Sequence, residues 1–207
     1  MKKPTRLFLL LTAIISFAFV NPKPSEPRQI NVMIDAGHGG TDFGAVSNTI
    51  NEKQIVEQIA NKIKSLNKNK NVVIHFTRNS DELLTLQERT QIINTTNPDL
   101  VLSLHVNSNS NLKKSGVEFY VANKEVAVSE KSNDLAIKLS SEFSKNSTLT
   151  IGRIMNAPFY ILKNATAPTV LIELGYLSNE NDKKYLTNEK EQDKIAENIL
   201  EFVSGLK

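Results

Sequence analysis

The chain is 207 residues long, enough for one domain with its own hydrophobic core, and it contains no cysteine. The lack of cysteine excludes disulfides, thiolate metal ligands and a lipid-modified N-terminal cysteine, so a metal site would have to consist of histidines and carboxylates. The formal net charge of +3 arises in the first 20 residues: removing their three basic residues from the 25 leaves 22 basic against 22 acidic residues, so the sequence gives no reason to expect nucleic-acid binding.

The first 20 residues have the build of a secretory signal peptide. Lys2, Lys3 and Arg6 form a positively charged start, and residues 7–20 form an almost unbroken apolar run. A membrane helix needs about 20 apolar residues, so the run is short for a span, and an uncleaved membrane anchor is the second interpretation. We expect export to the periplasm or the extracellular cell wall, with a cleavage site that the sequence does not define.

Residues 21–29 are predicted to form an extended, solvated linker, because three of these nine residues are proline. Folded sequence is expected to begin near Ile30. The segment 30–207 has the length of one domain and shows no internal repeat. We therefore expect a single domain there, preceded by the linker and the signal.

Short apolar runs rich in β-branched residues alternate along this domain with segments of helical period. The expected strands are Ile30–Asp35, Asn71–Thr77, Leu100–His105, Gly116–Val121, Phe159–Leu162 and Thr169–Leu174. The expected helices are Asn51–Leu66, Leu86–Asn94, Asn133–Phe143 and one near Glu189–Leu206. The alternation predicts an α/β fold: a mostly parallel, twisted sheet of about six strands with helices on both faces. In such sheets, binding sites gather beyond the carboxyl ends of the strands.

That rule separates the three histidines. His38 follows the first expected strand in a glycine-rich turn, and His105 ends the third, so both are candidates for metal binding. His75 lies in the middle of a strand, where a packed or edge histidine is the better interpretation.

Two carboxylates complete the set of candidate site residues. A catalytic zinc takes three protein ligands, so two histidines need a carboxylate beside them, and Glu52 lies in the first turn of the helix after the His38 loop. Its position alone fits a complement to the helix dipole equally well. Glu173 ends an otherwise apolar strand, where an acid is costly unless it is paired or functional. The alternative for it is a buried ion pair with Arg153 or Arg78.

With these residues in place, the sequence resembles the zinc-dependent amidase-3 family of N-acetylmuramoyl-L-alanine amidases over nearly all of residues 30–206. Five blocks carry the resemblance in order: Ile34 to Gly40 with Gly44-Ala45; Asn51-Glu52-Lys53; Thr77-Arg78 with Leu86 to Arg89; Ser103 to Asn107; and Pro168 through Glu173 to Asn179.

The resemblance implies zinc bound by His38, Glu52 and His105, with Glu173 as the catalytic acid and base. The implied reaction is hydrolysis of the amide that joins the lactyl group of N-acetylmuramic acid to L-alanine in peptidoglycan. A zinc peptidase that cuts within the stem peptide would use the same residue types and is the alternative enzyme. A third interpretation, a non-catalytic wall-binding module, usually accompanies a lost ligand or base, and none is missing here.

Three further residues are weaker candidates. Asp35 is expected either to orient a ligand imidazole or to cap the glycine turn. Asn107 is expected either to bind substrate or to bond its own turn. Arg153 is a candidate substrate-binding residue. Some relatives in this family carry an inserted helix that blocks the zinc site until an activator removes it, and the segment 122–132 is too short for one, so no activator protein should be strictly required.

Overall fold

The computed structural model of the protein describes residues 28–206, so the predicted signal and most of the predicted linker lie outside the described residues. Within this range, no helix combines the length and the apolar character that crossing a membrane requires.

Six strands form one twisted sheet, in the spatial order β4-β1-β5-β8-β6-β7. Their bounds are β1 Ile30–Ala36, β4 Val72–Phe76, β5 Leu100–Asn107, β6 Val117–Val121, β7 Ile151–Asn156 and β8 Thr169–Tyr176. The first four in spatial order are parallel to one another, whereas β6 pairs with β8 in the antiparallel sense and β7 runs parallel to β6. The predicted α/β class, with its mostly parallel sheet, is confirmed.

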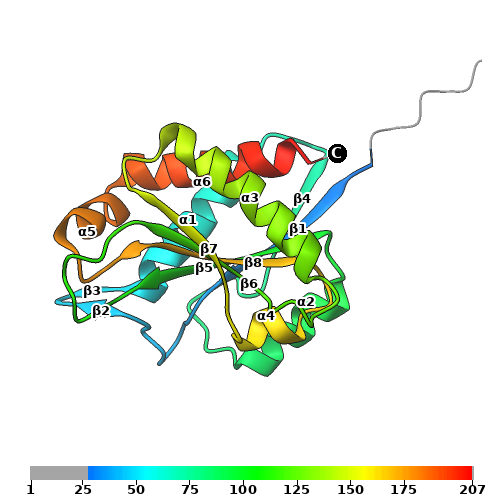
Figure 1. The fold of residues 1–207 in the computed structure, drawn as a ribbon, viewed down its shortest axis with the longest axis horizontal. Helices are drawn as coiled ribbons and strands as arrows, with labels where there is room; N and C mark the ends of the chain where they lie inside the picture. The colour runs from blue at the N-terminus through cyan, green and yellow to red at the C-terminus, as the bar shows by residue number, and fades with distance from the viewer. Residues whose placement is uncertain (1–27, 207) are drawn as a thin grey trace, which may run out of the picture.

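Helices cover both faces of the sheet (Figure 1). One face packs against α1 Glu52–Leu66, α3 Ser129–Asn146 and α6 Glu189–Ser204, and the other against α2 Leu86–Thr96 and the short α4 Tyr160–Asn164. A helix of seven residues, α5 Glu180–Leu186, follows β8. A small hairpin of β2 Val46–Ser47 and β3 Ile50–Asn51 precedes α1.

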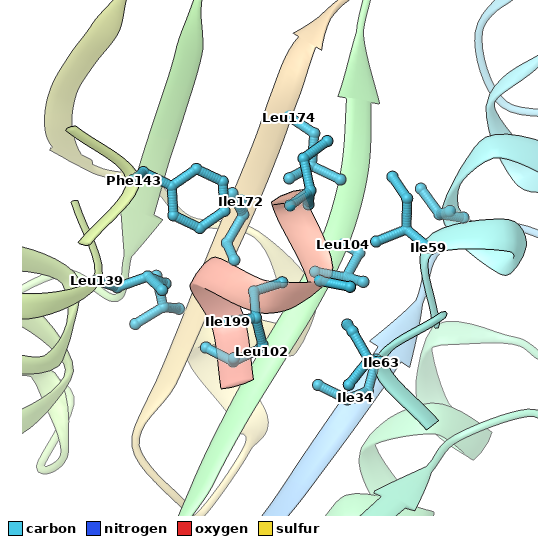
Figure 2. Close-up of a cluster of buried hydrophobic side chains, with 14 of the residues drawn as sticks. Ile34, Ile59, Ile63, Leu102, Leu104, Leu139, Phe143, Ile172, Leu174 and Ile199 are labelled. Carbon is cyan, nitrogen blue, oxygen red and sulfur yellow. The ribbon is translucent and has the colours of Figure 1, made fainter. Parts of the chain in front are cut away.

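The larger core lies between the sheet and the helices α1, α3 and α6, as Figure 2 shows. Alternate residues of each central strand point into it, and every third or fourth residue of each helix meets them: Ile34, Leu102, Leu104, Ile172 and Leu174 from the strands, with Ile59, Ile63, Leu139, Phe143 and Ile199 from the helices. Burying one such side chain contributes about 1.5–3 kcal/mol, so the core fixes the sheet that carries the site.

One predicted strand is wrong, and one strand of the main sheet was missed, as were the short strands β2 and β3 and the helix α5. The run Phe159–Leu162 begins α4, where the consecutive residues Ile161 and Leu162 are both buried, as one side of a short helix permits. A short apolar run cannot distinguish a strand from a buried helix turn. The missed edge strand is β7, whose glycine and two exposed polar residues interrupt the alternation expected of a strand. Helix α3 also begins four residues earlier than predicted, at Ser129.

Candidate metal centre and catalytic site

Four residues from four separate segments meet at the carboxyl ends of the parallel strands. His38 follows β1, Glu52 is the first residue of α1, His105 lies near the end of β5, and Glu173 lies in β8. His105 and Glu173 are direct partners in the parallel pairing of β5 with β8. The topology therefore places two histidines and two carboxylates on a common edge.

The glycine-rich loop after β1 fits closely around this edge. A Cβ atom at Gly37 would lie 2.4 Å from Cε1 of His105, and one at Gly44 would lie 2.4 Å from Oε2 of Glu52. Neither position can carry a side chain without moving a site residue. His38 itself has a φ of 58°, a left-handed conformation that is unusual outside glycine and that persists only where the surroundings hold it.

The carboxylate of Glu52 lies between the two imidazoles. Its Oε1 is 3.1 Å from Nε2 of His38 and 2.9 Å from Nδ1 of His105. Backbone amides fix the same carboxylate, because Val106 donates to Oε1 at 2.9 Å and Ala45 to Oε2 at 2.8 Å. The ligand atoms of the two histidines and Glu52 all lie within 4.8 Å of one another. These contacts connect Glu52 to both imidazoles and to the surrounding loops. Glu52 therefore does more than complement the dipole of α1.

The three side chains shift each other's pKa strongly. Burial alone would raise the pKa of Glu52, but the hydrogen bonds with His105 and His38 outweigh it and hold that pKa far below its usual range. Burial would lower the pKa of His38, yet its bonds with Glu52 and Asp42 raise it to about 9. Burial opposes the charged form of His105 as well, and its hydrogen bond with Glu52 again raises the pKa. In the metal-free protein, the imidazole of His38 therefore favours the protonated form at neutral pH, and the pKa of His105 is shifted in the same direction.

Asp42 holds the outer nitrogen of His38, a contact that the sequence analysis missed. Its Oδ2 lies 2.7 Å from Nδ1 of His38, and its Oδ1 accepts from the amide of Gly44 at 3.1 Å. A carboxylate on one imidazole nitrogen favours a proton there and leaves the other nitrogen free to act as a ligand. The four-residue spacing of His38 and Asp42 within a tight glycine loop was the available signal.

Asp35, expected either to orient a ligand imidazole or to cap the glycine turn, is enclosed by hydroxyl groups and a guanidinium. Thr77 and Ser103 hydroxyls donate to its two oxygens, each at 2.7 Å, and Nη1 of Arg89 donates at 2.8 Å. Arg89 in turn donates to the carbonyl oxygen of His38. Asp35 thus supports the site through Arg89, which holds the backbone of the His38 loop.

Glu173 is a partly buried carboxylate that lacks a partner among the described residues. Among the described residues, no cation forms an ion pair with it, and its Oε2 is buried without a hydrogen-bond partner. Arg78, one predicted partner, donates instead to Glu57 at 3.0 Å and to backbone carbonyls. The pKa of Glu173 is raised to about 7, and burial is the main cause. The charge of His105 lowers this pKa, whereas the carboxylates of Glu52 and Glu118 raise it further.

The two predicted substrate-binding residues lie on different strands, Asn107 at the end of β5 and Arg153 in β7. The side-chain oxygen of Asn107 accepts from the amide of Ser108 at 2.8 Å, as a residue bonding its own turn does, and its amide donates to Glu118 at 3.3 Å. Arg153 is exposed in the edge strand β7, where a bulge in the pairing with β6 sets Gly152 and Arg153 opposite Glu118.

A cavity of about 460 Å³ opens over the site. His38, His105 and Glu173 line one part of it, and apolar side chains from the loop before α2 and from the start of α4 line the rest. Substrate therefore has room beside the unpartnered carboxylate.

The donor set fits a zinc ion. Two donors bound to one tetrahedral zinc at about 2.0–2.2 Å lie roughly 3.4 Å apart. The separations of 3.1 and 2.9 Å from Glu52 Oε1 to the two imidazole nitrogens need only a small spread to meet that value. Two imidazoles and one carboxylate also suit a transition metal better than magnesium or calcium, which prefer oxygen ligands alone.

An α/β sheet that presents such a donor set beside a buried, unpartnered glutamate is typical of metal-dependent hydrolases. The particular family follows from comparison with known sequences: the model of the Amidase_3 family, described as N-acetylmuramoyl-L-alanine amidase, matches residues 32–204. The chain belongs to this family.

Similar proteins agree with this assignment. The germination-specific N-acetylmuramoyl-L-alanine amidase of Bacillus subtilis is 27% identical over 216 residues, covering 95% of this chain and 90% of its own. The crystal structure of an N-acetylmuramoyl-L-alanine amidase from Clostridium difficile 630 superposes with a TM-score of 0.80 at 31% identity, covering 86% of this chain and 96% of that one. The CwlD amidase of Clostridioides difficile, solved in complex with the GerS lipoprotein, has a TM-score of 0.76 at 28% identity and covers 85% of this chain and 99% of that one.

Proposed function

We propose that the protein is an exported, zinc-dependent N-acetylmuramoyl-L-alanine amidase that acts on peptidoglycan. The observation that carries the proposal is the convergence of His38, Glu52 and His105 beside the buried, unpartnered carboxylate of Glu173, within a chain of the amidase family. The three donors would hold the zinc. When bound, zinc supplies Lewis-acid polarisation of a carbonyl and lowers the pKa of water to about 7.

Glu173 is the group that moves protons in this proposal. It takes a proton from the water that attacks the lactyl carbonyl carbon, and it gives a proton to the nitrogen of L-alanine as the carbon–nitrogen bond breaks. A pKa raised to about 7 suits both steps, because the carboxyl is then available in either form near neutral pH. General acid–base catalysis of this kind contributes typically ~10²–10⁴ in rate.

The other residues position these groups. Asp42 sets the orientation of the His38 imidazole, and the two backbone donors on Glu52 keep its carboxylate between the imidazoles. Arg89 holds the His38 loop against Asp35. Arg153 and Asn107 are proposed as contacts for the peptide side of the substrate.

The deciding experiment is digestion of purified peptidoglycan by the zinc-loaded protein, with the released ends identified by mass spectrometry. An amidase leaves intact lactyl groups on the glycan and frees peptides that begin with L-alanine. Release of peptides cut within the stem would identify a peptidase instead, and binding to the wall without release would identify a non-catalytic module. Glu173→Gln serves as the inactive control.

We also propose that activity needs no activator protein. Helix α3 begins at Ser129, so only residues 122–128 connect it to β6, which is too few for an inserted blocking helix. The structure of the related CwlD amidase was solved with a lipoprotein partner, so activity without a partner is tested directly. The purified, zinc-loaded protein should digest peptidoglycan alone; complete inactivity that only a partner relieves would contradict this.

A further inference from the structure

Three exposed lysines follow one another at the end of α1. Lys64, Lys68 and Lys70 lie within seven residues, and all three are exposed. The five lysines that form ion pairs within residues 28–206 are others. Lys64, in the last turn, complements the dipole of α1, but Lys68 and Lys70 lie beyond the helix, where the dipole does not explain them. We call these three residues the lysine patch.

The acids of α1 and of the nearby strand starts have other partners. Glu52 lies in the metal site, and Glu57 forms an ion pair with an arginine. Asp193 of the neighbouring α6 pairs with a lysine, and Asp99 pairs with Arg28. The cavity of about 430 Å³ that borders the lysine patch has no carboxylate among its lining residues. These contacts leave the patch without a counter-charge from α1 or from the strand starts.

Two further acids lie on α6. Glu201 faces Glu142 of α3. Glu197 lies two helical turns before Ser204, the residue of α6 whose hydroxyl accepts from the side-chain amide of Asn69 at 3.1 Å. The end of α6 that meets the lysine patch is therefore uncharged, and the patch keeps an excess of positive charge.

The lysine patch lies at the amino ends of the parallel strands. Lys68 and Lys70 come just before β4, and Gln29, just before β1, donates to the carbonyl oxygen of Lys70 at 3.2 Å. Figure 1 shows the start of β1 and the end of α6 on this side of the domain. The metal donors lie at the carboxyl ends instead, about 20 Å away along β1, whose seven residues each rise about 3.3 Å. The patch and the catalytic edge therefore face opposite ways.

The sequence before Arg28 indicates what the lysine patch meets. Residues 7–20 form the apolar run of the export signal, and only residues 21–27 separate it from the described domain. Seven residues span at most about 25 Å, so a membrane that holds the apolar run lies close to the patch. Clustered lysines beside a membrane are attracted to the phosphates of anionic lipids.

We propose that the lysine patch lies on an anionic phospholipid surface, with its ammonium groups against lipid phosphates. The catalytic edge then faces away from the membrane, toward the wall. This inference goes beyond the proposed amidase activity, and its wall-facing orientation rests on the proposed export.

Vesicle sedimentation tests the proposal with the chain from residue 21, which contains both hydrophobic cores. At low ionic strength, the protein should bind vesicles that contain phosphatidylglycerol at least about fivefold more than vesicles of phosphatidylcholine alone, and salt at about 1 M should abolish the difference. The triple variant Lys64→Gln, Lys68→Gln and Lys70→Gln should lose most of this preference. Equal binding of the wild type to both kinds of vesicle would overturn the proposal.

A charge-matched variant replaces three exposed lysines elsewhere with glutamine: Lys113, Lys114 and Lys184. They lie before β6 and on α5, at the catalytic edge, and are not among the lysines that form ion pairs in the described chain. This variant should bind anionic vesicles as the wild type does. Equal losses in the two triple variants would show that total charge drives binding, and displacement by free glycerol phosphate would show a site for a single phosphate; either result overturns the proposal.

Single fluorescent labels test the orientation, because the chain has no cysteine of its own. Ser65→Cys lies beside the lysine patch and Ser110→Cys lies in the loop after β5 at the catalytic edge, and both positions are exposed. Anionic vesicles should shift the emission of a label at position 65 and leave that at position 110 unchanged; the reverse would overturn the orientation. Cleavage of a soluble muropeptide is measured on the same samples. Cleavage without a preference for anionic vesicles would refute the lysine patch alone, whereas vesicle binding without cleavage would refute the amidase proposal alone.

Discussion

Glu118 lies directly opposite Glu173 in the antiparallel pairing of β6 with β8, so two carboxylates share one face of the sheet next to the metal donors. Glu118 is itself held in place, because the Tyr120 hydroxyl donates to its Oε2 at 2.9 Å and the Asn107 amide at 3.3 Å. The neighbouring negative charge disfavours ionisation of Glu173 and adds to the effect of burial in raising its pKa.

Glu118→Gln should therefore lower the pKa of Glu173. The base form of Glu173 would then appear at lower pH, so the acid limb of the kcat/KM profile should move to lower pH. The measurement is the pH profile of peptidoglycan hydrolysis for the variant and the wild type. Glu125→Gln, a change at an exposed site in the loop after β6, is the control and should leave the limb in place. An acid limb that does not move in Glu118→Gln would mean that Glu118 acts only structurally.

The raised pKa of Glu173 also predicts a pH-dependent loss of stability in the metal-free protein. Its folded pKa is about 7 against an ordinary 4.5, so the neutral carboxyl is favoured on folding. No stability is lost below the ordinary pKa; loss begins as pH rises above it and is complete above about 7, reaching at most ~3 kcal/mol. Glu173→Gln removes this loss. Urea unfolding of the metal-free proteins should show the variant gaining on the wild type between pH 5 and pH 8.5; a pH-independent difference would argue against a buried neutral carboxyl.

Zinc binding should release protons. The pKa of His38 is raised to about 9, so its imidazole favours protonation in the metal-free protein at pH 7, and the pKa of His105 is raised as well, whereas zinc needs both imidazoles neutral. The apparent zinc affinity should therefore rise with pH up to about 9. Calorimetric titrations at pH 7 in buffers with different ionisation enthalpies would count the released protons. A binding enthalpy that does not depend on the buffer would contradict the prediction.

The sequence could predict most strands of the sheet, but fewer of the contacts that support the site. The strand ends at His38, His105 and Glu173 were predictable because buried parallel strands read as apolar runs and their carboxyl ends share an edge. The direction of β6 could not be predicted, because whether a strand pairs in the parallel or antiparallel sense depends on tertiary contacts that the run Val117–Val121 does not encode. The strand β7 was missed because Gly152 and a bulge interrupt its pattern.

The supporting contacts of the site were harder to predict than its donors. Asp35 and Asp42 are both acids beside the same glycine loop, and only the backbone conformation determines that Asp42 reaches His38 while Asp35 turns to Arg89. His38 contacts Asp42 from a left-handed backbone conformation, and a residue type gives no sign of that conformation.

Asp42→Asn and Asp35→Asn should consequently fail in different ways. Asp42 is half-exposed and holds a ligand imidazole, so its loss should weaken zinc affinity by about 10–100-fold with little change in stability. Asp35 is buried in an ion pair with Arg89, and leaving that guanidinium unpaired should cost about 3–5 kcal/mol of folding free energy. Zinc titration and urea unfolding of both variants check this. Equal losses of zinc affinity would place Asp35 in direct support of the metal instead.

The two glutamates of the site should separate most sharply, because a ligand and a proton carrier fail differently when they lose their charge. Glu173→Gln keeps the size and shape of the side chain, so the variant should fold, retain its zinc and still bind peptidoglycan fragments. Its turnover should fall by ~10²-fold or more, because no group remains to take a proton from water and return one to the leaving nitrogen. Glu52→Gln should instead lose zinc, since an amide oxygen is a poorer donor than the carboxylate that lies between the two imidazoles. Elemental analysis and single-turnover hydrolysis, each with and without excess zinc, measure both properties. Added zinc should restore part of the activity of Glu52→Gln and none of that of Glu173→Gln; zinc loss in Glu173→Gln with a fully loaded, active Glu52→Gln would exchange the two assignments.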